Sequence, residues 1–197
     1  MGSTVSCSHL SHEHCLQLSR EEIELISRCW NTEIKPHQVA FVCRPVVCAF
    51  SQCKALRRTM GIDEDDSKRW TAETRGLLDK LTERITEFLD KFLHLLLADQ
   101  TAAAEDLAIQ LGSRHVLYGY CDSKYEFRSI YWDILAIKLI RNFERQSWAK
   151  ASDLSCWRRF LDLLVRWLHK GFDEAQLSRE ISYMVRRSSI QSLNVSN

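Results

Sequence analysis

The longest periodic segment of the chain covers residues 71–97, and its period is that of an α-helix. Apolar side chains recur along one side of this segment, and polar ones lie largely on the other. The apolar positions are Leu78, Leu81, Ile85, Phe88, Leu89 and Phe92, and the polar ones are Thr82, Glu83, Glu87 and Lys91. This spacing predicts a long amphipathic helix that buries its apolar side in a core.

The first helix is predicted by a capping box that starts at Ser19. Glu22 follows three residues later, so each side chain can bond the backbone N–H of the other residue. The apolar positions that follow at helical spacing are Ile23, Ile26 and Trp30. A second helix is expected to begin at Pro36, where the missing N–H does no harm, and to kink or break at Pro45 within its apolar run.

Three more helices are predicted further along the chain. Their apolar spacing places them at residues 102–115, at about 124–146 and at about 154–172. An acidic loop is expected at 61–67, and a turn at 119–123. The connections between the predicted helices are therefore short.

The chain has few residues that break helices. It contains 2 prolines and 6 glycines among 197 residues, which favours long helices over the many turns of a β-sandwich. We expect an all-α architecture with six or seven helices and no convincing strand. A polar N-terminal tail (1–17) and a polar C-terminal extension (173–197) should flank one helical domain (18–172).

Charge and cysteine usage exclude several classes of protein. The 27 basic and 26 acidic residues give a net charge of +1 without any basic block, so no nucleic-acid partner is expected. No stretch approaches the ~20 uninterrupted apolar residues of a transmembrane helix. The 8 cysteines contain no CxxC pair and follow no apolar secretory segment, so reduced thiols in the cytosol are expected.

Three segments, taken in chain order, resemble helices of the globin family. The first has a Ser-led capping box before a Trp, the second has Leu-Gly and then a His three residues after the Gly, and the third opens with Trp and closes with Gly-Phe. They read LSREEIELISRCW, LAIQLGSRHVLYGY and SCWRRFLDLLVRWLHKGF, and they span residues 18–172. With its terminal extensions the chain is most similar to nematode or other invertebrate neuronal-type globins. The resemblance implies a globin fold, with six to eight helices in a three-over-three sandwich around haem.

This resemblance implies that His115 is the proximal ligand of the haem iron, because Leu111, Gly112 and His115 match the globin spacing. A neutral imidazole supplies the lone pair that the iron needs. The other ring nitrogen usually donates to an acceptor such as a carbonyl about one turn earlier, which sets the tautomer and the ring orientation. The alternative is a helix-end histidine that bonds the last carbonyls of its helix. Leu111 and Phe127 are expected beside the cofactor.

On the opposite side of the cofactor the resemblance places an apolar set: Val46, Met60, Leu81 and Ile85. Leu81 stands where many globins have a distal histidine, and no histidine occurs between positions 37 and 94. Bound O2 carries partial negative charge and is held longer by a nearby hydrogen-bond donor. An apolar pocket therefore suits binding of CO or NO, or redox signalling, at least as well as reversible carriage of O2.

Met60 and Arg84 each leave two alternatives open. Met60 falls where globins have an almost universal phenylalanine, and the proline usually found before it is absent. Its side chain either packs in the core or approaches the iron as a thioether ligand. Arg84 is a candidate hydrogen-bond donor to the bound gas, and the alternative is a solvated arginine or a partner of a haem propionate.

Both tails carry candidate modification sites. The N-terminus MGSTVSC fits a myristoylation pattern, with Gly2 first after removal of Met and Ser6 at the expected place. Cys7 follows directly and is a candidate for palmitoylation. A single myristoyl chain binds a membrane only marginally, so stable attachment needs the second chain. Near the other end, Ser189 follows two arginines and a serine and is a candidate for a basophilic kinase.

The sequence therefore predicts a haem globin that binds a diatomic gas (O2, and also CO or NO) or takes part in redox or oxygen signalling. We expect binding rather than catalysis, with incidental haem redox activity at most, and a protein redox partner of unspecified kind. The expected location is cytoplasmic, either dissolved or attached by lipid to the cytoplasmic face of a membrane. Two alternatives stay open: a haem-free globin-fold scaffolding protein, and a helical-bundle adaptor in which His115 caps a helix.

Overall fold

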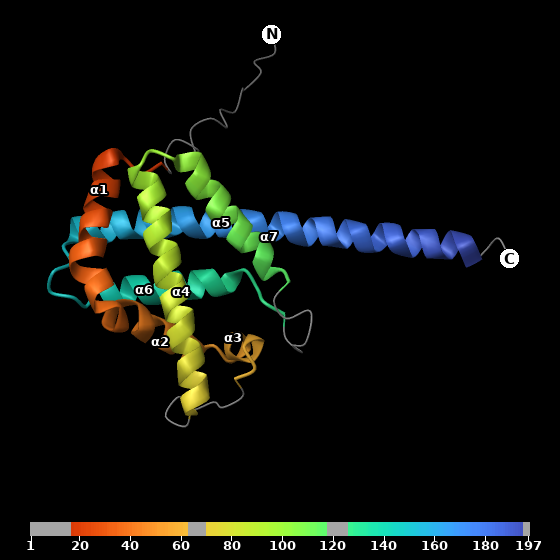
Figure 1. The fold of residues 1–197 in the computed structure, drawn as a ribbon, viewed down its shortest axis with the longest axis horizontal. Coiled ribbons are helices and arrows are strands. Elements are labelled where there is room, and N and C mark those ends of the chain that lie inside the picture. The colour runs from red at the N-terminus through yellow and green to blue at the C-terminus, as the bar shows by residue number, and fades with distance from the viewer. Residues whose placement is uncertain (1–16, 63–69, 118–125, 195–197) are drawn as a thin grey trace, which may run out of the picture.

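The computed structural model describes residues 17–62, 70–117 and 126–194, with side chains of the last range up to position 187. Within these ranges every regular element is a helix, which confirms the all-α prediction (Figure 1). None of the described helices is both long enough and apolar enough to cross a membrane.

The described elements follow one another with short connections. In chain order they are α1 (Arg20–Cys29), the π-helical turn η3 (Trp30–Ile34), the 3-10 turn η4 (Lys35–His37), the π-helical turn η5 (Val39–Cys43), α2 (Arg44–Gln52), α3 (Lys54–Thr59), α4 (Ala72–Leu97), α5 (Thr101–His115), α6 (Ile130–Phe143) and α7 (Ala151–Asn194). The predicted turn at 119–123 and most of the predicted acidic loop at 61–67 lie outside the described residues.

Helix α1 begins with the capping box that the sequence predicted. The hydroxyl of Ser19 accepts from the backbone N–H of Glu22 at 3.2 Å, and the Glu22 carboxylate accepts from the backbone N–H of Ser19 at 2.8 Å. Two donors that the first turn would otherwise leave unsatisfied are thereby paired. Glu22 also forms an ion pair with Arg159, which joins the start of α1 to α7.

The two prolines are accommodated by changes of helix type rather than by an open break. Pro36 lies in the 3-10 turn η4, and Pro45 is in the first turn of α2, directly after the π-helical turn η5. At that junction the backbone N–H of Arg44 donates to the carbonyl of Val39, five residues earlier. Because proline has no N–H to donate, the irregularity expected at Pro45 occurs as this transition from π- to α-helix.

Helix α4 buries Thr82 and Thr86 in addition to Leu78, Leu89 and Phe92 of its predicted apolar side. Thr82 and Thr86 are buried, with exposed fractions of 4% and 6%, whereas Leu81 and Ile85 are only half-buried. Each threonine hydroxyl donates to a carbonyl four residues earlier in the same helix, that of Leu78 for Thr82 and that of Thr82 for Thr86. The expectation that Thr82 lies on the polar side is therefore wrong, because its hydroxyl is satisfied inside the helix and its methyl can pack in the core.

The last two helices have other bounds than predicted. Helix α6 begins only at Ile130, because the segment before it turns Phe127 towards other aromatic rings instead of continuing the helix. Helix α7 does not end near 172 but runs to Asn194, so the predicted end is wrong. Neither proline nor glycine occurs between 173 and 194, and nothing in that stretch interrupts the helix.

In Figure 1, α4 and α5 cross in front of α6 and α7. Helix α5 packs along α7, α6 packs on α7 and α2, and α1 contacts both α4 and α7. The largest aromatic side chains that are completely buried are Trp30, Phe92, Phe143, Trp157 and Phe160. Trp157 lies with its ring centre 6.4 Å from that of Trp30 and 5.2 Å from that of Phe143. An aromatic core therefore holds the N-terminal helix and the last two helices together.

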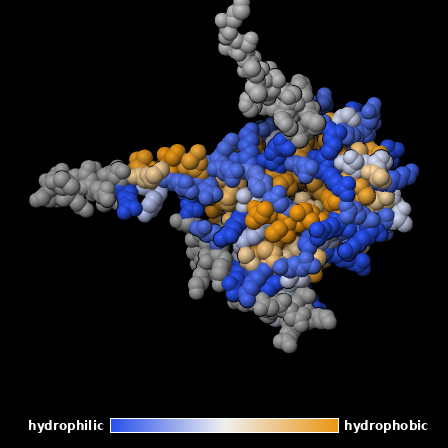
Figure 2. Space-filling view, turned by 180° about the vertical axis from the view of Figure 1, so that it is seen from behind, coloured by the Kyte–Doolittle hydropathy of each residue, from blue (hydrophilic) through white to orange (hydrophobic). Residues whose placement is uncertain are grey.

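The C-terminal part of α7 projects beyond the rest of the molecule (Figure 1). Figure 2, which is seen from behind, shows hydrophobic side chains gathered over the globular part and again near the end of the projecting helix. The exposed apolar residues of this projecting part are Leu177, Ile181, Tyr183, Met184 and Val185. The helix is thus amphipathic where it has left the body of the protein.

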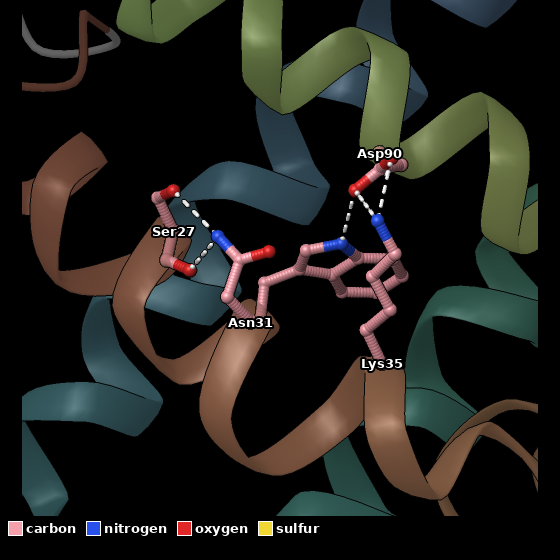
Figure 3. A network of polar contacts seen from close by, with 5 residues as sticks. Ser27, Asn31, Lys35 and Asp90 are labelled. Atoms are coloured by element: carbon pink, nitrogen blue, oxygen red, sulfur yellow. Dashed lines mark hydrogen bonds and ion pairs between the residues drawn. The ribbon is translucent and has the colours of Figure 1, made fainter.

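A polar network fastens the N-terminal helical segment to α4 (Figure 3). The indole N–H of Trp30 donates to Asp90 at 2.9 Å, and the ammonium of Lys35 lies 2.9 Å from both oxygens of the same carboxylate. Burial raises the pKa of Asp90, but the hydrogen bonds from Lys35 and Trp30 together lower it by more than burial raises it. The pKa of Asp90 therefore lies below its ordinary value. Asp90 is therefore charged at neutral pH and fixes the position of α4.

Candidate functional site

His115 is the last residue of α5, and its half-buried ring bonds its own helix. Ring nitrogen Nδ1 lies 2.8 Å from the carbonyl oxygen of Leu111, one turn earlier. Since a carbonyl oxygen can only accept, Nδ1 carries a proton, and in the neutral ring Nε2 then holds the lone pair. Burial lowers the pKa of His115 below its ordinary value of 6.5, and the hydrogen bond to Leu111 offsets only part of this. The imidazole is therefore neutral at pH 7.

Aromatic rings from three elements surround His115. Its ring centre lies 4.6 Å from that of Phe127, which precedes α6, and 5.3 Å from that of Trp132 in α6. Phe172 of α7 joins both, at 6.1 Å from Phe127 and 5.7 Å from Trp132. We call these four residues the His115 cluster. Phe127 was predicted to lie beside the cofactor, whereas Trp132 was not predicted at this place. The only signal of Trp132 was that of a large aromatic residue within a predicted helix.

Two glycines bring α5 and α7 into backbone contact beside this cluster. A Cβ atom on Gly112 would lie 2.1 Å from the carbonyl oxygen of Leu168, so only glycine fits at this crossing. The hydroxyl of Ser113 donates across the crossing to the carbonyl of Gly171 at 3.0 Å. The Leu-Gly pair before His115 thus has a structural role, because its glycine lets the end of α5 pack directly on the backbone of α7. This contact fixes the position of the His115 ring relative to α7.

A second histidine borders the cluster on its outer side. The Nε2 atom of His169 in α7 lies 2.8 Å from a carboxylate oxygen of Asp133, and its ring centre is 5.8 Å from that of Trp132. Trp132 therefore lies between two imidazoles, one from α5 and one from α7. His169 was not predicted from the sequence, because a lone histidine on a helix carries no signal without its partner.

The predicted distal residues lie on other helices. Val46 is completely buried in α2, and Met60 is half-buried at the end of α3. Leu81 and Ile85 are half-buried on α4, beside the buried face of that helix, and Arg84 is exposed. The structure therefore brings Leu111 and Phe127 to His115. The apolar distal set, Val46, Met60, Leu81 and Ile85, lies in or against the core on α2, α3 and α4, and Arg84 is exposed on α4.

No family model matches the chain, and no curated protein matches it. Within the described ranges no three His, Cys, Asp or Glu side chains gather into a group that could hold a metal ion. Haem does not require such a group, because one axial imidazole is sufficient to ligate its iron.

A groove of about 740 Å³ opens on the far side of the cluster, between residues 126–129 and α7. Phe127 and Phe172 line its inner end. Arg128 and Glu180 bring charge to it, and Tyr183 lines it further along the projecting part of α7. The groove mixes aromatic and charged side chains in an open trough, which suits a protein segment better than a small apolar ligand.

The predicted modification sites lie outside the residues whose side chains the structure describes. Gly2 and Cys7 lie outside the described residues. Ser189 lies within α7, in the stretch where only the backbone is described. All three therefore stay predictions from the sequence.

Proposed function

We propose that the chain is a haem-binding globin in which His115 is the axial protein ligand of the iron. The observation that carries this proposal is the hydrogen bond from Nδ1 of His115 to the carbonyl of Leu111, 2.8 Å long. It selects the tautomer with the lone pair on Nε2, and the lowered pKa keeps that ring neutral. A ligating imidazole needs both conditions.

The order and packing of the helices support the proposed globin fold. Helix α4 contacts both α1 and α5, and these three helices form one group. Helix α6 contacts both α2 and α7, and these three form the other group. Contacts of α5 and α1 with α7 join the two groups. This is compatible with three helices stacked over three, and with a haem between α4 and α5.

The residues present fit such a cofactor. Haem needs an apolar crevice as well as one ligand. Helix α4 carries a row of apolar side chains beside its buried face. Other protein atoms cover this row only partly, and it consists of Leu77, Leu81, Ile85 and Phe88. Leu77 is 39% exposed, and the other three are half-buried. A flat apolar ring system against this row would complete the burial of these side chains.

When bound, haem would supply an iron centre that holds a diatomic gas or exchanges an electron. The carbonyl of Leu111 orients the His115 ring, and the rings of Phe127 and Trp132 restrict its rotation and exclude water from it. On α4, Leu81 and Ile85 offer no hydrogen bond to a bound gas. We therefore favour CO or NO binding, or redox signalling, over storage of O2.

A haem-free interaction module is the second candidate function. The close packing of the His115 ring on Phe127 and Trp132 favours it, because an aromatic cluster of this kind is stable as a core without any cofactor. In that case Leu111 and His115 form a helix end and nothing more. A cytoplasmic location, with or without a lipid tether at Gly2 and Cys7, is compatible with either function.

Haem titration of the purified protein separates the two candidates. The wild-type chain should develop a Soret band with a stoichiometry of one, and His115→Ala should abolish or strongly weaken it. His169→Ala is the matched control, since it removes another half-buried histidine at the edge of the same cluster and should leave the band intact. A wild-type chain that takes up no haem, or a band that survives in His115→Ala, contradicts the proposal.

A further inference from the structure

The projecting part of α7 exposes apolar residues at a regular spacing. Leu177 is 58% exposed, Ile181 48% and Met184 58%. Their separations of four and then three residues are those of the d, a and d positions of a heptad repeat. On a helix these three side chains form a single stripe, of the kind that packs against another helix.

Charged residues flank this stripe at heptad spacing. Asp173, Glu180 and Arg187 stand seven residues apart, at g positions beside the apolar stripe, and all three are exposed. The end of the series nearest the body is acidic, and the end nearest the C-terminus is basic. Such a helix is complementary in charge to a second copy of itself that runs in the opposite direction.

We propose that this part of α7 is a self-association surface, on which a second copy of the chain docks through the same helix in antiparallel orientation. The two-fold axis passes near Glu180. Asp173 of each copy then faces Arg187 of the other, and the stripe of Leu177, Ile181 and Met184 is covered. This inference does not depend on haem binding.

The groove beside the His115 cluster gives the partner helix a second place of contact. In the antiparallel arrangement the C-terminal end of one helix lies beside Asp173 of the other, where α7 leaves the body. There the groove begins at Phe127 and Phe172, and it continues along α7 to Tyr183, which is 65% exposed. Aromatic side chains of this kind are typical of interface anchors. The stripe and the groove thus form a continuous surface.

The size of the surface limits the affinity. Residues 173–187 span about 22 Å of helix at 1.5 Å per residue, which is short for a stable coiled coil. Glu180 meets its own copy at the two-fold axis, and this like-charge contact weakens the pair further. We therefore expect a dimer that forms and dissociates with protein concentration, rather than an obligate one.

Sedimentation velocity on the full chain over a range of concentrations tests the surface. The wild type should pass from monomer to dimer, and Leu177→Glu/Ile181→Glu should stay monomeric with an unchanged circular dichroism spectrum. Ser182→Glu adds one negative charge on a face of the helix that points away from the stripe, and it should dimerise like the wild type. A wild type that is monomeric at every concentration, or a dimer that persists in the double variant, overturns the proposal.

Charge exchange tests the orientation. Asp173→Arg and Arg187→Asp should each weaken the dimer several-fold, and the combination of both should restore it, because opposite charges then face each other again. Arg186→Asp is the control, since Arg186 lies on the opposite side of the helix, and Glu180→Gln should strengthen the dimer. Absence of rescue in the Asp173→Arg/Arg187→Asp protein contradicts antiparallel pairing and indicates a parallel dimer or another occupant of the stripe.

Discussion

A Cβ atom placed on Gly171 would lie 2.0 Å from the carbonyl oxygen of Ile109, so the backbones of α7 and α5 are in direct contact. The contact is reciprocal, since Gly112 lies in the same way against Leu168. His115 follows Gly112 by three residues. The position of the candidate ligand therefore depends on a helix crossing that admits no side chain.

Gly171→Ala should destabilise the protein by about 1–3 kcal/mol or more, because the methyl group must push two backbones apart. Urea unfolding followed by circular dichroism measures the change in the free energy of unfolding. Gly76→Ala in α4 is the control, since a Cβ at Gly76 meets nothing within 4 Å. The control should gain about 0.5–1 kcal/mol from the higher helix propensity of alanine. Equal effects of the two substitutions would refute the tight crossing.

His115 should make the stability of the apoprotein depend on pH. Its pKa in the folded state is lowered from 6.5, so the unfolded chain binds this proton more readily than the folded chain. The contribution of His115 to stability is therefore fully present above pH 6.5 and is lost as the pH falls towards the folded pKa. Unfolding free energies between neutral pH and about pH 5 should fall less in His115→Gln than in the wild type. Equal falls in the two proteins would contradict the lowered pKa of His115.

Asp90 should affect the stability of the protein at a lower pH than His115 does. Its pKa in the folded state lies below 3.8, so its contribution to stability is present above pH 3.8 and is lost as the pH falls through the folded pKa. The Asp90→Asn variant loses the ion pair with Lys35, and we expect a cost of about 1 kcal/mol or less at neutral pH, because water screens this pair. Below the folded pKa the variant and the wild type should be equally stable. Acid titration of the unfolding midpoint checks this, and a difference that persists in acid would show another role for Asp90.

The haem-loaded ferrous protein should contain five-coordinate, high-spin iron. This follows from the proposed function and from the absence of histidine between positions 37 and 94. Optical spectra of the reduced protein give the coordination, and Met60→Leu should not alter them if Met60 packs in the core. A low-spin ferrous spectrum that turns high-spin in Met60→Leu would instead identify Met60 as a thioether ligand.

Membrane attachment through the N-terminus has a separate test. If Gly2 is myristoylated and Cys7 palmitoylated, the wild-type protein should fractionate with membranes in cells. Gly2→Ala should then move to the supernatant, and Cys7→Ser should show intermediate partition. Equal partition of all three proteins would refute acylation.

The helix pattern of α1 and α4 was readable from the sequence because their signals are local. A capping box joins residues three apart, and Ser19 and Glu22 need nothing else to start α1. Apolar periodicity in the same way located α4 to within a residue at each end. The hydrogen bond of the His115 ring is also a local feature, because its acceptor, the carbonyl of Leu111, lies one turn earlier on the same helix.

Other features could not be read in this way. Periodicity placed Leu81 on the buried side of α4 and Thr82 on the polar side, but packing against the neighbouring helices turned the buried face towards Thr82 and Thr86. A hydropathy scale counts threonine as polar. It takes no account of the small free-energy cost of burying a hydroxyl that is hydrogen-bonded to its own helix. The position of Trp132 beside His115 likewise required the contact of α6 with α5 and α7.

Caps, periods and breakers act over a few residues, and they were enough to predict the helical class, the start of α1, the extent of α4 and α5, and the place of His115 at a helix end. Packing between helices sets which residues of α4 are buried, which rings surround His115, and that α7 leaves the body as an exposed amphipathic helix. These depend on contacts between residues far apart in the chain. Gly112 combines both levels: its place before His115 is visible in the sequence, but the reason for a glycine there is the backbone of α7.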